Sequence, residues 1–223
     1  MDNPQNKPDA ARPRIGIFGG TFNPVHLGHL IAAQDALESA ELDQILFMPC
    51  PRPVHKPAVE LTNARHRVNM LHLALEGETA FEVSTWELDH GAPCYALDTV
   101  TGLAALHPDA DLYFLVGADM LLDLPNWRQV TQLLDRCRIC PIWRPGQGDP
   151  ATIAARIDLP PPWPDTLARQ MIRGHQVGIA SRDLRRRIAE GQRIRYLVPP
   201  EVEMYISEHN LYRGYPSAQQ DTP

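Results

Sequence analysis

The sequence has little lysine, little cysteine and no long apolar stretch. Only two of its 21 basic residues are lysines, and 27 acidic residues leave a formal charge of −6. A protein that coats nucleic acid or an anionic membrane needs an excess of basic residues, so this balance argues against both partners. No stretch approaches the ~18 apolar residues of a membrane-spanning helix.

The cysteines and the N-terminal segment indicate a cytoplasmic location. Four cysteines in 223 residues show no disulfide-framework spacing, which favours a reducing compartment. The polar segment 1–14 has no apolar run behind it and does not resemble a signal peptide. Cys137 and Cys140 have the CxxC spacing, but they lie in an apolar run and no second pair is present. A buried strand is therefore the preferred interpretation of that segment.

Composition and patterning predict one globular α/β domain. Hydrophobic residues make up 43% of the chain and charged residues 22%, which suits a protein with a sizeable core. We expect a disordered tail over 1–13, a single domain over 14–213 and a frayed tail over 214–223. Strand-like and helix-like patterns alternate, which predicts a doubly wound, Rossmann-like parallel sheet with helices on both faces and a small C-terminal helical portion.

Individual elements follow from local patterns and capping residues. Strands are expected at 15–18, 45–48, 81–86, 112–116, 139–143 and 176–179. Helices are expected at 26–40, from a cap at Thr62 to Gly77, at 98–106, after a cap at Asn126, at 182–190 after a cap at Ser181, and at 201–208. The segment 144–164 holds six prolines and two glycines, which predicts a surface excursion.

The most informative segment follows the first predicted strand and reads GGTFNPVHLGH, from Gly19 to His29. In a doubly wound sheet this turn lies at the carboxyl edge of the strand, where ligands bind, and the next helix offers free N–H groups to an anion. The turn matches neither the dinucleotide fingerprint nor the Walker loop. His26 and His29 are three residues apart on one helical turn and therefore face the same way, as donors to phosphate oxygens would.

Two other interpretations of this histidine pair stay open. The pair could hold a metal ion, although the sequence fixes no third ligand nearby. The two rings could also lie on the helix surface without a role. The glycine turn that precedes them favours the phosphate interpretation.

The same segment, Gly19 to His29, resembles the GGTF(D/N)PxHxGH motif of nucleotidyltransferases with the HxGH signature, and specifically the bacterial nicotinate-nucleotide adenylyltransferase family. Further similar segments follow in order, and the likeness covers about residues 15–213. They are PCPRPVHK at 49–56, RVNML at 67–71, CYALDT at 94–99, VGAD at 116–119, PNW at 125–127, RPG at 144–146, LVP at 197–199, YI at 205–206 and LY at 211–212. The order and spacing of so many segments are more specific than any single motif.

The resemblance implies a reaction, two substrates and a cofactor. The family joins nicotinate mononucleotide to the AMP part of ATP and releases pyrophosphate, with Mg²⁺ as cofactor. The attacking phosphate oxygen is already an anion, so the protein has to align the reactants and neutralise charge rather than supply a base. We therefore expect ATP and nicotinate mononucleotide as ligands, Mg²⁺ bound mainly through the ATP phosphates, and no dedicated metal ligands in the chain.

The resemblance also assigns roles to residues. The expected catalytic residues are His26, His29, Lys56 and Arg185. Besides His26, His29 and Arg185, the expected ATP contacts are Gly19, Gly20, Thr21, Phe22, Gly117, Asp119, Ile179, Ser181 and Arg182. The expected contacts of the mononucleotide are Asn23, Lys56, Tyr95, Thr99 and Trp127, with the Trp127 ring against the pyridine. The competing interpretations are a surface lysine for Lys56, a core tryptophan for Trp127, and packing alone for Tyr95 and Thr99.

One segment departs from the family pattern. The family has IS(S/A)TxIR before its penultimate helix, and the hydroxyls and the arginine of that segment bind the triphosphate. Here the run is IASRDLR at 179–185, in which Ser181 keeps one hydroxyl and Arg182 stands at the threonine position. We expect Arg182 and Arg185 to share a helix face, with Arg182 replacing the lost contacts by a charge-assisted one. The competing hypothesis is that ATP binding is weakened or lost.

Other functions remain open at this point. They are adenylyl transfer to nicotinamide mononucleotide or phosphopantetheine, and nucleotide binding without catalysis. The proline loop with His55 and Lys56, together with the PNW segment, favours nicotinate mononucleotide. Residues 182–195 carry six arginines against Asp183 and Glu190, so an acidic chain still has a cationic segment for two anionic substrates. The sequence leaves a homo-oligomer open.

Overall fold

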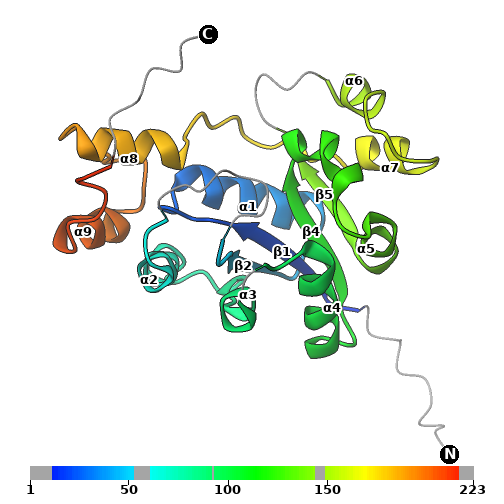
Figure 1. Cartoon of the computed structure of the whole chain (residues 1–223), viewed down its shortest axis with the longest axis horizontal. Coiled ribbons are helices and arrows are strands. Elements are labelled where there is room, and N and C mark those ends of the chain that lie inside the picture. The colour runs from blue at the N-terminus through cyan, green and yellow to red at the C-terminus, as the bar shows by residue number, and fades with distance from the viewer. Residues whose placement is uncertain (1–11, 53–60, 92, 144–148, 216–223) are drawn as a thin grey trace, which may run out of the picture.

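The computed structural model describes residues 12–52, 61–91, 93–143 and 149–215 (Figure 1). Within these ranges, five parallel strands form one sheet in the order β3-β2-β1-β4-β5. The strands are β1 (Arg14–Gly20), β2 (Gln44–Pro49), β3 (Phe81–Val83), β4 (Asp111–Gly117) and β5 (Arg138–Ile142). The order reverses direction around β1, which confirms the predicted doubly wound α/β fold.

Helices cover both faces of this sheet. They are α1 (Leu27–Ser39), α2 (Ala64–Ala74), α3 (Trp86–His90), α4 (Ala96–Leu106), α5 (Val130–Arg136), α6 (Pro150–Ala154), α7 (Trp163–Arg169), α8 (Ser181–Ala189) and α9 (Pro200–Glu208). Two 3₁₀ turns, η1 (Ala118–Leu122) and η2 (Leu124–Asn126), follow β4. Figure 1 shows α8 and α9 at the end of the molecule opposite α6 and α7. No helix in the described parts of the chain has the length and apolar character needed to span a bilayer.

The core has two layers because alternate strand residues face opposite sides of the sheet. Ile17 and Met48 are fully buried in one cluster with side chains of α4, η1 and α5. Ile45 and Phe47 are fully buried in the other cluster with side chains of α1, α2 and α9. Both faces of the strands are thus apolar, as a parallel sheet between two helical layers requires.

Strand register brings several predicted site residues to one edge. β1 pairs with β2 so that Gly20 lies opposite Pro49, and it pairs with β4 so that Phe18 lies opposite Leu115. The carboxyl ends of β1 and β4, at Gly20 and Gly117, therefore meet at the same edge of the sheet. Ligands of open α/β sheets bind at this edge, beside the strand where the order reverses.

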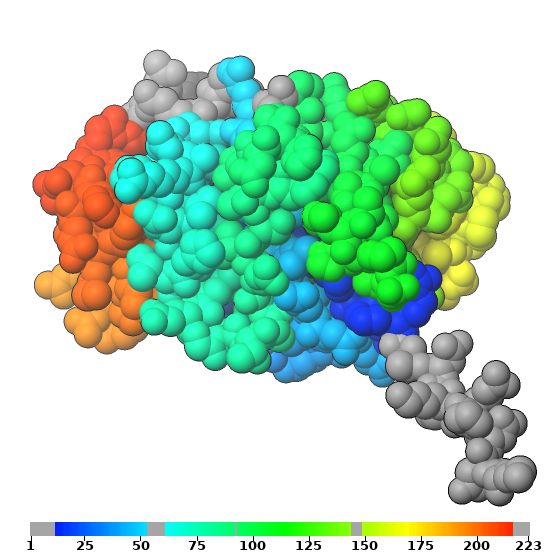
Figure 2. Space-filling view, turned by 90° about the horizontal axis from the view of Figure 1, so that it is seen from below, coloured from blue at the N-terminus to red at the C-terminus, as the bar shows by residue number. Residues whose placement is uncertain are grey.

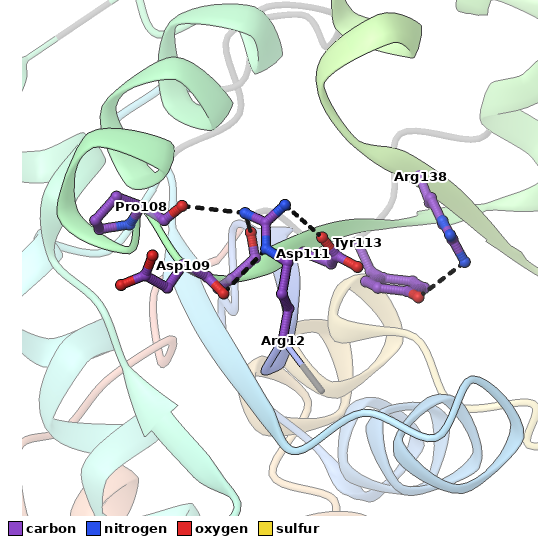
Figure 3. Close-up of polar contacts among 7 residues, drawn as sticks. Arg12, Pro108, Asp109, Asp111, Tyr113 and Arg138 are labelled. Carbon is purple, nitrogen blue, oxygen red and sulfur yellow. Dashed lines mark hydrogen bonds and ion pairs between the residues drawn. The ribbon is translucent and has the colours of Figure 1, made fainter. Parts of the chain in front are cut away.

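Arg12 fixes the opposite edge of the sheet. Its guanidinium donates to the carbonyl oxygens of Pro108, Asp109 and Ala110 at 3.0–3.2 Å and lies 3.3 Å from the Asp111 carboxylate (Figure 3). These contacts hold Arg12, which belongs to the predicted tail, against the start of β4. They tie the beginning of β1 to the loop that follows α4.

Two predicted caps are wrong. Asn63, rather than Thr62, caps α2, and its side chain accepts a hydrogen bond from the Arg65 backbone N–H at 2.9 Å. Asn126 ends η2 instead of capping α5, whose cap is Gln129 with a left-handed φ of 53°. Local capping signals indicated the neighbourhood of each helix start but not the residue.

The predicted strand at 81–86 is too long, because β3 ends at Val83 and Trp86 begins α3. A Cβ added to Gly102 would lie 2.1 Å from the Trp86 indole, so this ring rests directly on the backbone of α4. Packing of the indole on α4 therefore accompanies the early turn away from the sheet edge.

The predicted strand at 176–179 is not formed, and the additional pairing with β5 occurs at Ile172 instead. The Ile172 backbone N–H donates to Pro141 O at 2.8 Å, and its carbonyl accepts from the Trp143 N–H at 2.9 Å. Ser181 is the first residue of α8 and Ala180 is the cap, so the predicted Ser181 cap is also wrong.

The segment predicted as a surface excursion contains α6 and the start of α7. Residues 144–148 of this segment lie outside the described residues. Asp149 caps α6 by accepting from the Ala151 and Thr152 N–H groups, and Pro150 occupies the first turn. Pro164 likewise lies in the first turn of α7. Proline suits this position because the first helical N–H groups have no intrahelical partner, so the prolines mark helix starts here.

Candidate active site

The turn between β1 and α1 is shaped around Phe22. Phe22 has a left-handed φ of 45°, and its fully buried ring packs against Phe18 and Phe47 at centroid distances of 5.7 Å. A Cβ on Gly20 would lie 2.9 Å from this ring, whereas a Cβ on Gly19 would meet nothing within 4 Å. Gly20 is therefore required by packing, and Gly19 leaves the strand end open to solvent.

The two histidines form one compact unit at the start of α1. Their rings stack with centroids 3.7 Å apart, and the His26 backbone N–H donates to His29 Nδ1 at 3.2 Å. His26 is buried and His29 half-buried. A Cβ on Gly28 would lie 3.0 Å from His26 Nδ1, so the glycine of the HxGH pattern leaves room for the His26 ring. Because His29 Nδ1 is an acceptor, the neutral ring carries its proton on Nε2.

Two buried arginines hold the backbone of the same turn. Arg67 on α2 is 1% exposed and donates from Nη1 to Thr21 O at 2.9 Å and from Nε to Thr62 O at 3.1 Å. Arg185 on α8 is 6% exposed and donates from Nη1 to Asn23 O at 2.6 Å. Burial lowers the pKa of Arg67. The turn is thus gripped from α2 on one side and from α8 on the other.

Asn23 is a second anchor of the turn. Its side chain is 1% exposed, and Oδ1 accepts from the Thr62 backbone N–H at 3.3 Å and from Tyr212 Oη at 2.9 Å. Burial raises the pKa of Tyr212 to about 12, so this hydroxyl stays protonated and remains a donor near neutral pH. The predicted contact of Asn23 with the mononucleotide stays a prediction.

The start of α8 reaches the turn as well. Ser181 Oγ donates to Pro24 O at 2.9 Å, so the one remaining hydroxyl of the altered segment is engaged with the opening turn. Arg182 is exposed, whereas Arg185 is buried against Asn23, so the two arginines do not present one common face to solvent. Ile179 is half-buried just before this helix.

The other expected ATP contacts lie at the end of β4. Gly117 is the last residue of this strand, and Asp119 is exposed in η1 directly after it. In the described parts of the chain, no three His, Cys, Asp or Glu side chains come together as metal ligands would. Binding of Mg²⁺ stays a prediction.

Burial raises the pKa of Cys137 to about 12 and that of Cys140 to about 11, which keeps both thiols protonated.

The expected contacts of the mononucleotide are spread over α4 and the loop before α5. Tyr95 precedes α4, with the Arg128 guanidinium 4.9 Å from its ring centroid. Trp127 is half-buried, with its ring edge-on to Phe114 at 6.1 Å. Thr99 has no exposed surface and donates to the Glu87 carboxyl at 2.8 Å, and its predicted contact with the mononucleotide stays a prediction. Lys56 lies outside the described residues.

The described residues line two cavities. One of about 420 Å³ is lined by Trp143, Asp149, Pro150, Arg173, Gly174 and Gln176, beyond the carboxyl end of β5. The other, of about 490 Å³, lies between α8 and α9 and includes Ile188, Arg193 and Leu211 in its lining. Among the described residues, no predicted site residue lines either cavity.

Sequence reasoning gave no role to Arg67, Glu87, Tyr212 or Tyr215. A signal for Arg67 was present, because Met70 and Leu71 lie three and four residues further on and define the buried face of α2. An arginine on an apolar helix face needs internal acceptors, here the carbonyls of Thr21 and Thr62. The contacts of Tyr212 and Tyr215 join residues 189 and 30 positions apart, and no local pattern indicates them.

Comparisons with known proteins concern the family and the fold of this chain. A family model described as Cytidylyltransferase-like matches residues 17–187. This match and the parallel sheet with its glycine and histidine turn define the class of the protein as a nucleotidyltransferase enzyme. A relative from Geobacillus thermodenitrificans, named "Probable nicotinate-nucleotide adenylyltransferase", is 40% identical over 199 residues, covering 89% of this chain and 86% of the relative. The chain belongs to the nicotinate-nucleotide adenylyltransferase family.

Further comparisons extend this result. A relative of the same name from Thermomicrobium roseum is 42% identical over 201 residues, covering 90% of this chain and 92% of the relative. The solved structure of a Plasmodium falciparum nicotinic acid mononucleotide adenylyltransferase complexed with NaAD has the same fold, with a TM-score of 0.66 and 19% identity. The alignment covers 90% of this chain and 98% of that protein.

The glycine pair of the turn gives a direct test of this packing. Gly20→Ala is expected to lower the free energy of unfolding by about 1–3 kcal/mol, because the new methyl group overlaps the Phe22 ring. Gly19→Ala, the matched control in open space, is expected to change it by no more than about 0.5 kcal/mol. Urea unfolding measures both values, and equal effects of the two substitutions would contradict the packing described for Phe22.

Proposed function

We propose that the protein transfers AMP from ATP to nicotinate mononucleotide, giving nicotinate adenine dinucleotide and pyrophosphate. The observation that carries this proposal is the β1–α1 turn, in which the open Gly19 backbone leads to the stacked His26 and His29 rings at a helix N-terminus. The names of the curated relatives and the NaAD complex of the Plasmodium protein support the choice of substrate.

The chemistry asks for alignment rather than for a base. A phosphate oxygen of the mononucleotide attacks the α-phosphorus of ATP, a new P–O bond forms, and the bond from the α-phosphorus to the bridging oxygen breaks as pyrophosphate leaves. The nucleophile is already ionised, so no side chain has to remove a proton. The protein brings two anions together and stabilises charge on the transferring group and on the leaving pyrophosphate.

Residues around the turn supply the donors for this charge. The Gly19, Gly20 and Thr21 backbone and the positive end of the α1 dipole attract the triphosphate, and His26 and His29 act as donors to its oxygens. One well-placed donor in such a site contributes about 3 kcal/mol to the transition state. Arg182 and Arg185 add cationic donors from α8. Mg²⁺, held mainly by the ATP phosphates, would neutralise further charge, with Asp119 as the exposed carboxylate after β4.

The mononucleotide is assigned to the side of the site that Tyr95 and Trp127 border. The Trp127 ring offers a face to the pyridine, and Lys56 is a cation for the substrate phosphate. The buried Glu87–Thr99 hydrogen bond supports the first turn of α4, next to Tyr95. Thr99 thus supports this side of the site from within.

We further propose a cytoplasmic location, because all four cysteines are free thiols.

Initial rates with ATP and each of three acceptors test the choice of substrate: nicotinate mononucleotide, nicotinamide mononucleotide and phosphopantetheine. Pyrophosphate release is expected to be faster with the acid, nicotinate mononucleotide, than with the amide, nicotinamide mononucleotide. A preference for the amide or for phosphopantetheine would overturn the assignment of nicotinate mononucleotide as the substrate. No pyrophosphate release from any pair at high protein concentration would support nucleotide binding without catalysis.

The altered α8 segment gives a second test. Arg182→Ala is expected to raise KM for ATP about tenfold, because a charge-assisted contact with the triphosphate is lost. Arg185→Ala is expected to lower kcat/KM further, since it also releases Asn23. Arg186→Ala is the control, because this exposed neighbour pairs with Asp183 at 3.2 Å on the same helix. Unchanged kinetics in both Arg182→Ala and Arg185→Ala would contradict triphosphate binding by this helix.

A further inference from the structure

The end of the chain returns to the opening turn. After α9, which Figure 2 shows beside α2, the backbone bends through left-handed residues at Asn210 (φ 52°) and Tyr212 (φ 64°). Tyr212 Oη then donates to Asn23 Oδ1 at 2.9 Å, and Tyr215 Oη accepts from Arg185 Nη2 at 2.8 Å. Two tyrosines from one short segment thus contact the two residues that anchor the turn to α8.

Tyr215 contacts Arg185 in two ways. Besides the hydrogen bond, the Arg185 guanidinium carbon lies 4.5 Å from the centroid of the Tyr215 ring. Arg185 Nη1 is already bound to Asn23 O at 2.6 Å. The guanidinium is therefore fixed at both terminal nitrogens, by the turn on one side and by the tyrosine on the other. A planar group held in this way has little freedom to reorient.

Among the described residues, Nε is the one nitrogen of the Arg185 guanidinium for which no hydrogen bond is formed. This nitrogen is buried, and the residue as a whole is 6% exposed. A buried donor without an acceptor is costly, and an anionic oxygen placed beside it would remove that cost. The arrangement therefore holds a cationic group in a fixed orientation with donor capacity to spare, as a receptor for a phosphate group would.

We propose that Tyr215 is a positioning residue, which orients the Arg185 guanidinium for the triphosphate of ATP. The proposal rests on the proposed function, because it needs Arg185 to contact that ligand. Tyr215 itself touches neither substrate. It stabilises the one orientation of Arg185 in which Asn23 O is also bound, so the opening turn and the guanidinium are preorganised together.

Two substitutions separate the contributions of the ring and the hydroxyl. Tyr215→Ala removes both and is expected to raise KM for ATP about tenfold, while kcat and the KM for the mononucleotide change by less than about twofold. Tyr215→Phe keeps the ring on the guanidinium. Its change in log KM for ATP is expected to be no more than half of that of Tyr215→Ala. In an Arg185→Ala background, Tyr215→Ala is expected to have no further effect.

Tyr113→Phe is the matched control. The Tyr113 hydroxyl also accepts from an arginine, Arg138 Nη1 at 3.1 Å, but this pair lies near the start of β4, away from the proposed site (Figure 3). Removing that hydroxyl leaves the kinetic constants unchanged if the effect belongs to Arg185. If Tyr113→Phe raises KM for ATP as much as Tyr215→Ala does, the effect is a general loss of stability and the proposal is overturned.

Calorimetric titration with inorganic tripolyphosphate separates this proposal from the proposed function. The wild-type protein and Tyr215→Phe are expected to bind this probe more tightly than Tyr215→Ala does. If the wild type turns over ATP but Tyr215→Ala keeps the wild-type KM, the positioning role alone is wrong. If the wild type shows no turnover, the proposed function fails. The titration then still tests whether Tyr215 positions Arg185 for a triphosphate. Equal affinities, tighter binding by Tyr215→Ala, or no binding by the wild type each contradict the positioning role.

Discussion

The candidate site depends on two buried guanidinium groups that donate to backbone carbonyls of one irregular turn. Helices and strands pair their own carbonyls, but the backbone from Thr21 to Asn23 belongs to neither and needs other donors. Arg67 and Arg185 provide them from α2 and α8. Hydrogen bonds to charged groups contribute roughly 1.5–3 kcal/mol each, whereas an unpaired buried charge would cost several times more. The arginines and the turn therefore stabilise one another.

This arrangement also decides the electrostatics of the site. Two cations lie against the turn, and the N-terminus of α1 adds a partial positive charge at the same place. The whole chain carries −6, so the cationic character is local rather than general. This local positive charge favours a small anion such as a triphosphate at this edge, as the proposed function requires. The overall charge and the anionic ligands of the proposed function are therefore compatible.

Much of the fold could be predicted from the sequence because its strands are buried on both faces. Apolar runs placed β1, β2, β4 and β5 to within two residues, and helical periodicity placed α1 and α9 equally well. The errors arose where tertiary contacts override local preference. Trp86 lies in α3 and packs on Gly102 instead of extending β3. The strand predicted at 176–179 is not formed, and Ile172 pairs with Ile142 instead. The proline-rich composition of 144–164 predicts a surface excursion, but the prolines at 150 and 164 occupy first helical turns.

The sequence indicated the glycine and histidine turn of the candidate site, but not the distant residues that hold this turn in place. The glycines and the HxGH spacing indicated the turn, and the structure brings His26 and His29 together as stacked rings. The supports come from distant segments, such as Tyr212, which meets Asn23 across 189 positions. Thr99 shows the opposite case, since a residue inside a recognised motif proves to be buried against Glu87. Spacing identifies which residues share a turn, but only the fold shows which distant residues pack against them.

Amide hydrogen exchange with and without a non-hydrolysable ATP analogue tests the central claim most directly. We predict that the turn held by Arg67 and Arg185 binds the triphosphate. The analogue then slows exchange in peptides that cover residues 19–29 and 180–185, at the starts of α1 and α8. Slower exchange confined to residues 188–194 and 203–213, which border the cavity between α8 and α9, would contradict the account.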